Sequence, residues 1–263
     1  MAGNDVFVLA YTHGWRGGLR NLLGAEFGKW FRTNMWWIQS LIWIVVINGV
    51  LVGLLWSEAE LDALEAAAFF SLFMGLFPTI AIIIIMQDAI VGEKESGTAA
   101  WVLSKPASRS AFVLSKLVAN MFGVLITMVL LPSLVAYIQI SLASGGYVNP
   151  VNFIGGLGVI YLNLVFYLTL TLMLGTFFNH RGPVIGIPLA LAFGQQLILG
   201  IHPFLVEVMP WTLVVPYGDI ELPMAAAVIR GEAVHSMIPF YTALSLSILF
   251  AALSLWRFEK EEF

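Results

Sequence analysis

Six long apolar runs limit what this chain can fold into. A helix needs about 20 mostly apolar residues to cross the roughly 30 Å hydrocarbon core of a membrane, and each run supplies that length. The runs are residues 36–56, 66–91, 112–142, 153–178, 183–206 and 238–256. The second and third are longer than a bilayer requires, so we expect them to tilt or to project into water. The sequence therefore predicts an all-α integral membrane protein with six transmembrane helices.

The composition supports this class and excludes others. Of the 263 residues, 60% are hydrophobic and only 11% are charged, which is too little charge for the surface of a soluble domain of this length. A net charge of −4 gives no indication of a nucleic-acid partner. The absence of cysteine removes disulfides, thiol catalysis and thiolate metal sites. We expect membrane lipid around the chain and no nucleic acid.

The basic residues predict the orientation. With six spans, every one of the 12 Lys and Arg residues except Arg230 falls on one side. Acidic residues of the opposite side are Glu58, Glu60, Asp62, Glu65, Glu207, Asp219, Glu221 and Glu232. Because positive residues remain inside, the basic side is predicted to be cytoplasmic. We expect a multi-pass protein of the cell membrane with both termini in the cytoplasm.

The first 35 residues are predicted to form a cytoplasmic segment with an interfacial helix. Apolar residues recur at helical spacing between Trp15 and Phe31, and Lys29 and Arg32 lie mostly opposite them, as in a helix at the membrane surface. Glu26 interrupts the apolar stripe, and a carboxylate there is costly unless it is paired. We expect Glu26 to meet a base or a protein neighbour. The alternative is a frayed N-terminal anchor.

Residues 36–263 form the predicted six-helix domain. Its last outer connection, residues 207–237, is punctuated by Pro210, Pro216 and Pro223. Such a segment favours short helices that rest on the outer leaflet or partly enter it, as a re-entrant region. The fifth and sixth spans flank this connection.

No catalytic, metal or nucleotide site can be assembled from the sequence. A phosphate-binding loop needs a glycine-rich turn followed by Lys and Ser or Thr, and no stretch has that spacing. The four histidines fall in separate segments, without the spacing of a metal pair. Asp88, the only acid among the polar residues we assign to the spans, lies one turn from the cytoplasmic loop, where it can reach water or Lys94. We expect no enzyme activity and no cofactor in this chain.

Three amides inside the spans leave two interpretations open. Asn163 lies in the fourth span, and Gln195 and Gln196 lie near the middle of the fifth. Buried amides can join membrane helices through hydrogen bonds of roughly 0.6–2 kcal/mol each. They can equally line a substrate path.

The loop at residues 92–111 is the only long, charge-rich segment between two apolar runs. Gly97 is predicted to end the helix that continues the second span, and Pro106 to end a short apolar segment at residues 98–103. Ser108 is a suitable N-cap for the next helix. Trp101 and Leu103 have no bilayer to enter there, so we expect them to seek a protein groove. The alternative is a solvated connection without a partner.

The loop resembles that of the permease subunits of type-2 ABC exporters. The pattern is carried by Glu93, Glu95, Gly97, Thr98, Leu103, Ser104, Pro106, Ser108, Arg109 and Lys116. An interfacial helix containing Glu26, six spans and a longer last outer loop extend the resemblance over nearly the whole chain.

The resemblance implies a half-transporter without its own ATPase. Two permeases, identical or paralogous, would face each other, and each loop would dock on one of two ABC ATPase subunits that bind Mg-ATP. ATP hydrolysis would then drive a substrate outward, whether lipid, polysaccharide, peptide, drug or ion. The alternatives are an ATP-independent secondary transporter or channel, and a membrane scaffold for an ATPase.

Overall fold

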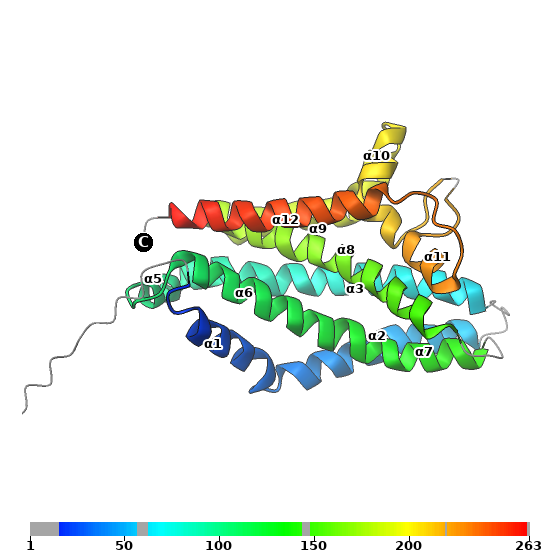
Figure 1. Cartoon of the computed structure of the whole chain (residues 1–263), viewed down its shortest axis with the longest axis horizontal. Coiled ribbons are helices and arrows are strands. Elements are labelled where there is room, and N and C mark those ends of the chain that lie inside the picture. The colour runs from blue at the N-terminus through cyan, green and yellow to red at the C-terminus, as the bar shows by residue number, and fades with distance from the viewer. Residues whose placement is uncertain (1–15, 57–62, 144–147, 219, 262–263) are drawn as a thin grey trace, which may run out of the picture.

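The computed structural model describes residues 16–56, 63–143, 148–218 and 220–261, and these form helices without a strand. The long helices lie side by side along one axis (Figure 1). They are α2 (Met35–Leu55), α3 (Ala63–Gln87), α6 (Arg109–Val124), α7 (Leu131–Ala143), α8 (Pro150–Phe177), α9 (Arg181–Leu199) and α12 (Ile238–Glu259). The shorter ones are α1 (Leu19–Phe31), α4 (Glu93–Glu95), α5 (Thr98–Leu103), α10 (Pro203–Val208), the 3-10 turn η3 (Pro210–Leu213) and α11 (Met224–Arg230). The all-α prediction is confirmed.

Five helices in the described residues are long and apolar enough to cross a membrane. They are Met35–Leu55, Glu65–Glu95, Arg109–Ala143, Pro150–Phe177 and Ile238–Glu259. The fifth run, predicted as one helix over residues 183–206, is instead divided. Helix α9 ends at Leu199, and α10 begins at Pro203 after His202, whose Nδ1 accepts a hydrogen bond from the Phe204 amide. This side-chain cap starts a new helix, which that prediction overlooked.

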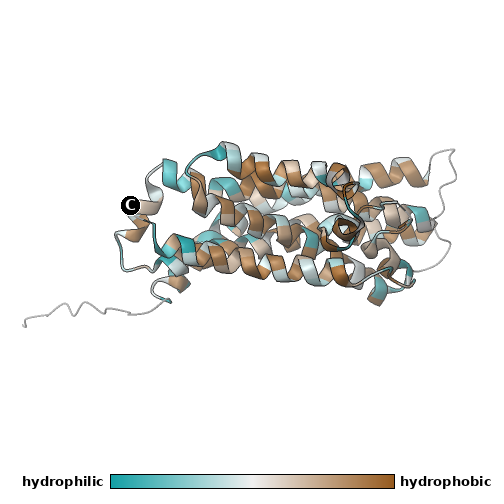
Figure 2. Cartoon of the chain, turned by 90° about the horizontal axis from the view of Figure 1, so that it is seen from above, coloured by the Kyte–Doolittle hydropathy of each residue, from teal (hydrophilic) through white to brown (hydrophobic). Residues whose placement is uncertain are grey.

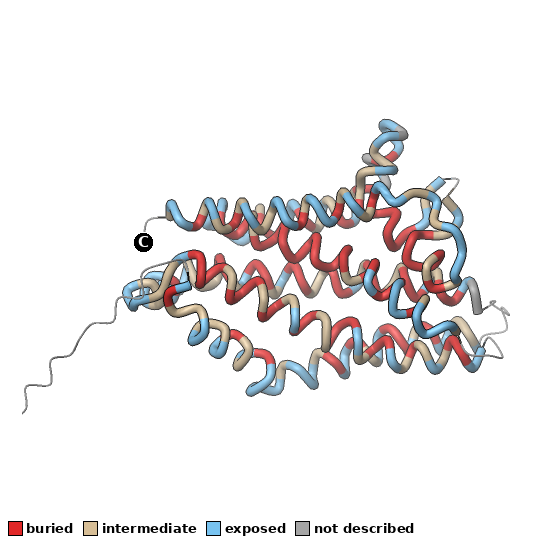
Figure 3. Tube along the Cα trace, in the orientation of Figure 1, coloured by how far each residue is buried: buried red, intermediate tan, exposed pale blue. Residues whose placement is uncertain are grey.

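Helix α8 is the centre of the bundle. In its most apolar stretch 78% of the residues are buried, against 28% in α2 and 22% in α12. It packs against α3, α11 and α12, and it is red over most of its length in Figure 3. Because α8 is apolar all round, it has no polar face to turn outward and takes the core position. The outer helices keep large apolar side chains exposed.

Two long helices contain π-helical turns, which are rare and often occur at functional sites. Helix α3 continues through the π turn η1 (Asp88–Gly92) into α4, and α6 continues through η2 (Leu125–Leu130) into α7. We call η1 and α4 together the 88–95 extension. It carries most of the charge between α3 and α5.

Polar residues gather toward the ends of the bundle, and the middles of the long helices are apolar (Figure 2). One end, the charged end, comprises the 88–95 extension, α5, the starts of α1, α6 and α9, and the ends of α8 and α12. It is held together by bonds such as that from the Ser108 amide to the Gly17 carbonyl, 2.9 Å. Four acidic residues predicted for the opposite side, together with Trp15, lie outside the described residues: Glu58, Glu60, Asp62 and Asp219.

Helix α1 forms as predicted and packs against α6. The Trp30 indole is buried, and its Nε1 donates a hydrogen bond to Asn120 Oδ1 at 3.1 Å. Gly123 leaves the space for this ring, because a Cβ there would overlap the indole. The described part of the N-terminal segment is therefore a docked helix.

Candidate functional site

The 88–95 extension is the hub of the charged end. As a helix it points side chains in several directions, and its charged residues contact α1, α6, α9, α12 and the end of α8. Three groups of contacts follow, one on each side of the extension. Together they fix how α5, the next helix, is carried by the bundle.

The first group is a buried cluster of two acids and two bases. Lys116 of α6 has a fully buried side chain, and its Nζ lies 2.6 Å from Glu93 Oε1 and 3.0 Å from Glu26 Oε1. Lys29 of α1 donates to the same two carboxylates at 2.8 and 2.9 Å. The formal charges cancel, which a buried ammonium requires because an unpaired charge is far costlier to bury. The cluster ties α1 and α6 to the extension.

The electrostatics of this cluster keep Lys29 charged. Burial lowers the pKa of Lys29, but its hydrogen bond to Glu93 and the attraction of Glu26 outweigh burial, so the pKa is raised above 10.5. A raised pKa contributes stability that is fully present below the unfolded-state pKa and is lost only as the pH rises through the folded value. The link between α1 and the extension is therefore insensitive to pH near neutrality.

The second group surrounds Lys94. Its Nζ lies 2.9 Å from Glu261 Oε1, 3.2 Å from Asn179 Oδ1 and 3.3 Å from the Thr176 carbonyl oxygen. This ammonium therefore satisfies carbonyl and amide groups at the end of α8 and an acid just after α12. We expected Asp88 to reach water or Lys94. Asp88 is exposed, but Lys94 points away to α8 and α12.

The third group is exposed. Arg181 Nε donates to Glu95 Oε2 at 2.9 Å, and its Nη2 lies 3.5 Å from Asp88 Oδ1. Its side chain is 49% exposed and that of Asp88 67%. Arg181 begins α9, so this pair connects α9 to the extension across water rather than through the core.

Helix α5 projects from the hub at the charged end (Figure 1). Gly97 has φ of 72°, a left-handed conformation that suits glycine, so the extension ends there as predicted. Ala99 is buried, Leu103 packs partly against the core, and Trp101 is 62% exposed with Lys105 Nζ 3.4 Å from its ring centre. The helix thus presents an aromatic face outward. Thr98 and Pro106, at its two ends, are exposed.

The start of α6 is fixed as the sequence predicts. The Ser108 hydroxyl accepts a hydrogen bond from the Ala111 amide, which makes it the N-cap. Arg109 donates to the Glu259 carbonyl at 3.0 Å, and Ser110 donates to the Glu259 carboxylate at 2.6 Å. Arg109 therefore holds the end of α12, in addition to lying on the rim of α5.

The predicted site residues divide into two sets. Gly97, Trp101 and Arg109 lie at or beside the exposed face of α5, whereas the Glu93 carboxylate turns inward to Lys116 and Lys29. Glu95 is exposed and faces Arg181. The inward turn of Glu93 has a simple cause. The buried ammonium of Lys116 needs an acid, and Glu93 is on the side of the extension that faces α6.

The interfacial-helix residues are also divided. Glu26 is buried and paired with two bases, so the expectation that it meets a base is confirmed. Lys29 bridges to Glu93, whereas Arg32 is exposed at the C-terminal end of α1. These contacts make α1 part of the hub.

The buried amides join helices in this structure. Asn163 Nδ2 donates to the Gly75 carbonyl at 3.0 Å, linking α8 to α3. Gln195 is 1% exposed; it donates to the Tyr167 hydroxyl at 2.6 Å and accepts from the Trp211 amide at 3.1 Å. This geometry favours helix joining for both. The side chain of Gln196 lies outside what the structure describes.

Sequence reasoning missed Lys94, Lys116 and Arg181 as members of the site. A signal for Lys116 was present, because it lies inside the predicted third span, at residues 112–142. A lysine at that depth needs a partner, and Glu26 and Glu93 were the acids placed nearest by topology. No comparable signal marks Arg181, which follows the end of a span like many exposed bases.

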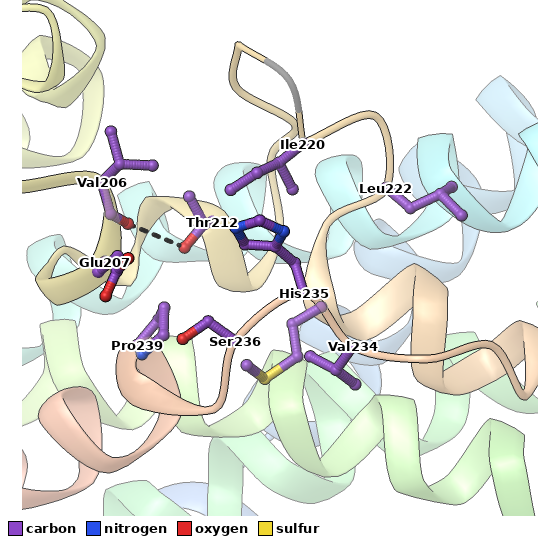
Figure 4. A pocket seen from close by; sticks show the side chains of 10 residues that line it. Val206, Glu207, Thr212, Ile220, Leu222, Val234, His235, Ser236 and Pro239 are labelled. Atoms are coloured by element: carbon purple, nitrogen blue, oxygen red, sulfur yellow. Dashed lines mark hydrogen bonds between the residues drawn. The ribbon is translucent and has the colours of Figure 1, made fainter. Parts of the chain in front are cut away.

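A small pocket lies at the opposite end, beside α10, η3 and the start of α12 (Figure 4). Its walls include Glu207, Thr212 and His235, and Thr212 Oγ1 donates to the Val206 carbonyl at 3.4 Å. At about 20 Å³ the pocket has room for about one water molecule. Over the described residues, His, Asp and Glu form no group of three that could hold a metal ion.

Long apolar helices joined at one end by a charged hub are compatible with an all-α membrane protein. Residues 35–263 match the DUF2705 family, described as a protein of unknown function, and the chain belongs to that family. No curated protein was found to match it.

Proposed function

We propose that the chain is the permease half of an ATP-binding-cassette exporter of type 2. Helix α9 serves as a sixth span beside the five long apolar helices, and α1 lies in the cytoplasmic interface. Helix α5 is the coupling helix, and α10, η3 and α11 form the outer, partly re-entrant region. Two permeases, identical or paralogous, work with two separate ATPase subunits that bind Mg-ATP. The charged end faces the cytoplasm of the cell membrane, together with both termini.

The observation that carries this proposal is the exposed face of α5. A helix of six residues sits between two helices of 31 and 35 residues, which are longer than a bilayer requires. Its Trp101 is 62% exposed beyond the apolar part of those helices. A large aromatic side chain in that position suits a pocket on a partner, because Trp is enriched among residues that dominate binding.

The hub gives this docking helix a route to the rest of the chain. A displacement of α5 moves the 88–95 extension, whose ion pairs hold α1, α6, α9 and α12. In the proposed cycle, closure of the ATPase dimer pulls on α5 and the hub distributes the movement to these helices. The chain itself carries out no covalent chemistry.

The experiment uses two tryptophans at the same end with similar chemistry. Trp101 and Trp256 are 62% and 52% exposed, and each has a lysine over its ring, at 3.4 Å for Lys105 and 4.0 Å for Lys260. The full chain is co-expressed with the ABC ATPase encoded beside it and purified in detergent. Binding of the ATPase and ATP hydrolysis are then measured for Trp101→Ala and Trp256→Ala.

The proposal expects Trp101→Ala to weaken ATPase binding at least about tenfold, as for a central interface tryptophan. Trp256→Ala should leave binding nearly unchanged, because α12 is not the docking helix. Equal effects of the two substitutions, or no retention of the ATPase by the unaltered chain, would contradict the proposal.

A further inference from the structure

A cavity of about 760 Å³ lies beside the hub, between α1, the end of α3 and the start of α9. Its volume falls in the range of small-molecule sites. One wall is apolar and includes Ile84 and Ile85, and the other is polar and includes Gln87, Asp88 and Arg181. No function described so far uses this space.

The walls change character over one turn of helix. Ile84 and Asp88 are four residues apart, or about 6 Å along a helix. An apolar region therefore meets a charged one within the cavity, as hydrocarbon meets headgroups at a membrane surface. Exposed apolar residues continue away from the cavity along α3, with Ile84 51%, Phe77 40% and Phe69 37% exposed. This stripe is long enough to accompany an acyl chain.

The charges in the cavity are mixed rather than of one sign. Lys29 and Arg181 line it as cations, and Glu26, Asp88 and Glu93 as anions, with Lys116 directly behind the two glutamates. The most accessible pair is Arg181 and Asp88, whose atoms are 3.5 Å apart. Such a pair can offer a guanidinium to a phosphate and a carboxylate to an ammonium. A ligand that carries both charges fits better than one with a single charge.

Gln87 adds an unused polar group. Its residue is 4% exposed, it lines the cavity, and its Oε1 has no hydrogen-bond partner among the described residues. A buried amide without a partner is unfavourable. Since a carboxamide can both donate and accept, a headgroup with N–H donors and phosphate acceptors can satisfy it.

We infer that this cavity binds the headgroup of a zwitterionic aminophospholipid, with one acyl chain along the exposed stripe of α3. The phosphate lies toward Arg181 and the primary ammonium toward Asp88 and Gln87. This inference rests on a membrane location but not on the proposed ATPase partner. It can therefore fail while the exporter proposal stands, and the reverse.

The test uses the purified full-length chain in detergent and native mass spectrometry. The probes are dioleoyl-phosphatidylethanolamine, the corresponding phosphatidylcholine and the corresponding phosphatidylglycerol. Choline lacks N–H donors and glycerol lacks the cation, so the three lipids separate hydrogen bonding from charge. We expect the ethanolamine lipid to bind about tenfold more tightly than the other two, the size of one charge-assisted hydrogen bond.

Gln87→Met and Asp88→Asn should each reduce that preference severalfold. Gln139→Met is the matched control, because Gln139 also has a buried Oε1 without a described partner but does not line the cavity. Thermal unfolding of each variant shows whether it is folded, and either of the two cavity variants is sufficient for the test.

Three outcomes would overturn the inference. Equal binding of the three lipids would indicate an unselective surface. A preference for phosphatidylglycerol would assign the cavity to anions. A chain that is dimeric at every lipid concentration and retains no lipid would assign the cavity to a second copy.

Discussion

Two ion-pair groups flank the same helical extension, and they differ in what surrounds them. On the side of α1 and α6, Lys116 is fully buried between Glu93 and Glu26. On the side of α9, Arg181 is about half exposed between Glu95 and Asp88. Both groups join the 88–95 extension to a neighbouring helix with similar charges. The comparison teaches that the buried group determines whether the charged end folds, whereas the exposed group can open without loss of the fold.

The largest expected effect is that of Lys116→Met. Removal of the ammonium leaves two carboxylates close together and largely buried, and loss of one partner of a buried ion pair costs about 3–5 kcal/mol. The measurement is unfolding of the purified chain in detergent. The triple variant with Glu26→Gln and Glu93→Gln should recover much of the loss, because no unpaired charge then remains. An effect no larger than that of Arg181→Met would contradict the distinction between the groups.

A smaller loss is expected where α1 is docked rather than paired. Gly123→Ala places a Cβ against the Trp30 indole, and such overpacking costs about 1–3 kcal/mol. The release of α1 is measured as increased protease access to α1. Gly24→Ala is the control, since a Cβ at Gly24 meets nothing within 4 Å. Equal protease access in both variants would show that the Trp30 contact does not hold α1.

The smallest effect is expected for Arg181→Met. An exposed ion pair contributes below about 1 kcal/mol and is screened by salt. Unfolding at low and high salt is the measurement. The stability difference from the unaltered chain should be small at low salt and should disappear at high salt. A large loss that persists in high salt would mean that this group is as structural as the buried one.

The sequence was sufficient for the helical class and for several local features. Helical periodicity located α1, and turn chemistry located the Gly97 break and the Ser108 cap. The cost of an unpaired carboxylate foretold that Glu26 would be paired. Each of these depends on neighbours in sequence or on one general energetic rule. The exporter function remains a proposal.

The partners within the hub could not be predicted in the same way. The direction of Glu93 depends on how the extension is rotated relative to α6, which no local pattern fixes. Lys94 reaches Glu261, 167 positions away, through helix packing that apolar patterns leave undetermined. The division of the fifth run at residues 200–202 was missed because hydrophobicity continues through it while the helix does not.

The π turn at the base of the extension has a consequence for phase. A π-helical turn closes a wider ring than an α-helical turn, so it accommodates an extra residue. One residue is worth about 100° of rotation in an α-helix of 3.6 residues per turn. The angular setting of every side chain after η1 therefore depends on that single turn. If the turn relaxed to α geometry, Glu93, Lys94 and Glu95 would rotate away from their partners together, so one local change in backbone winding could release all three sides of the hub at once.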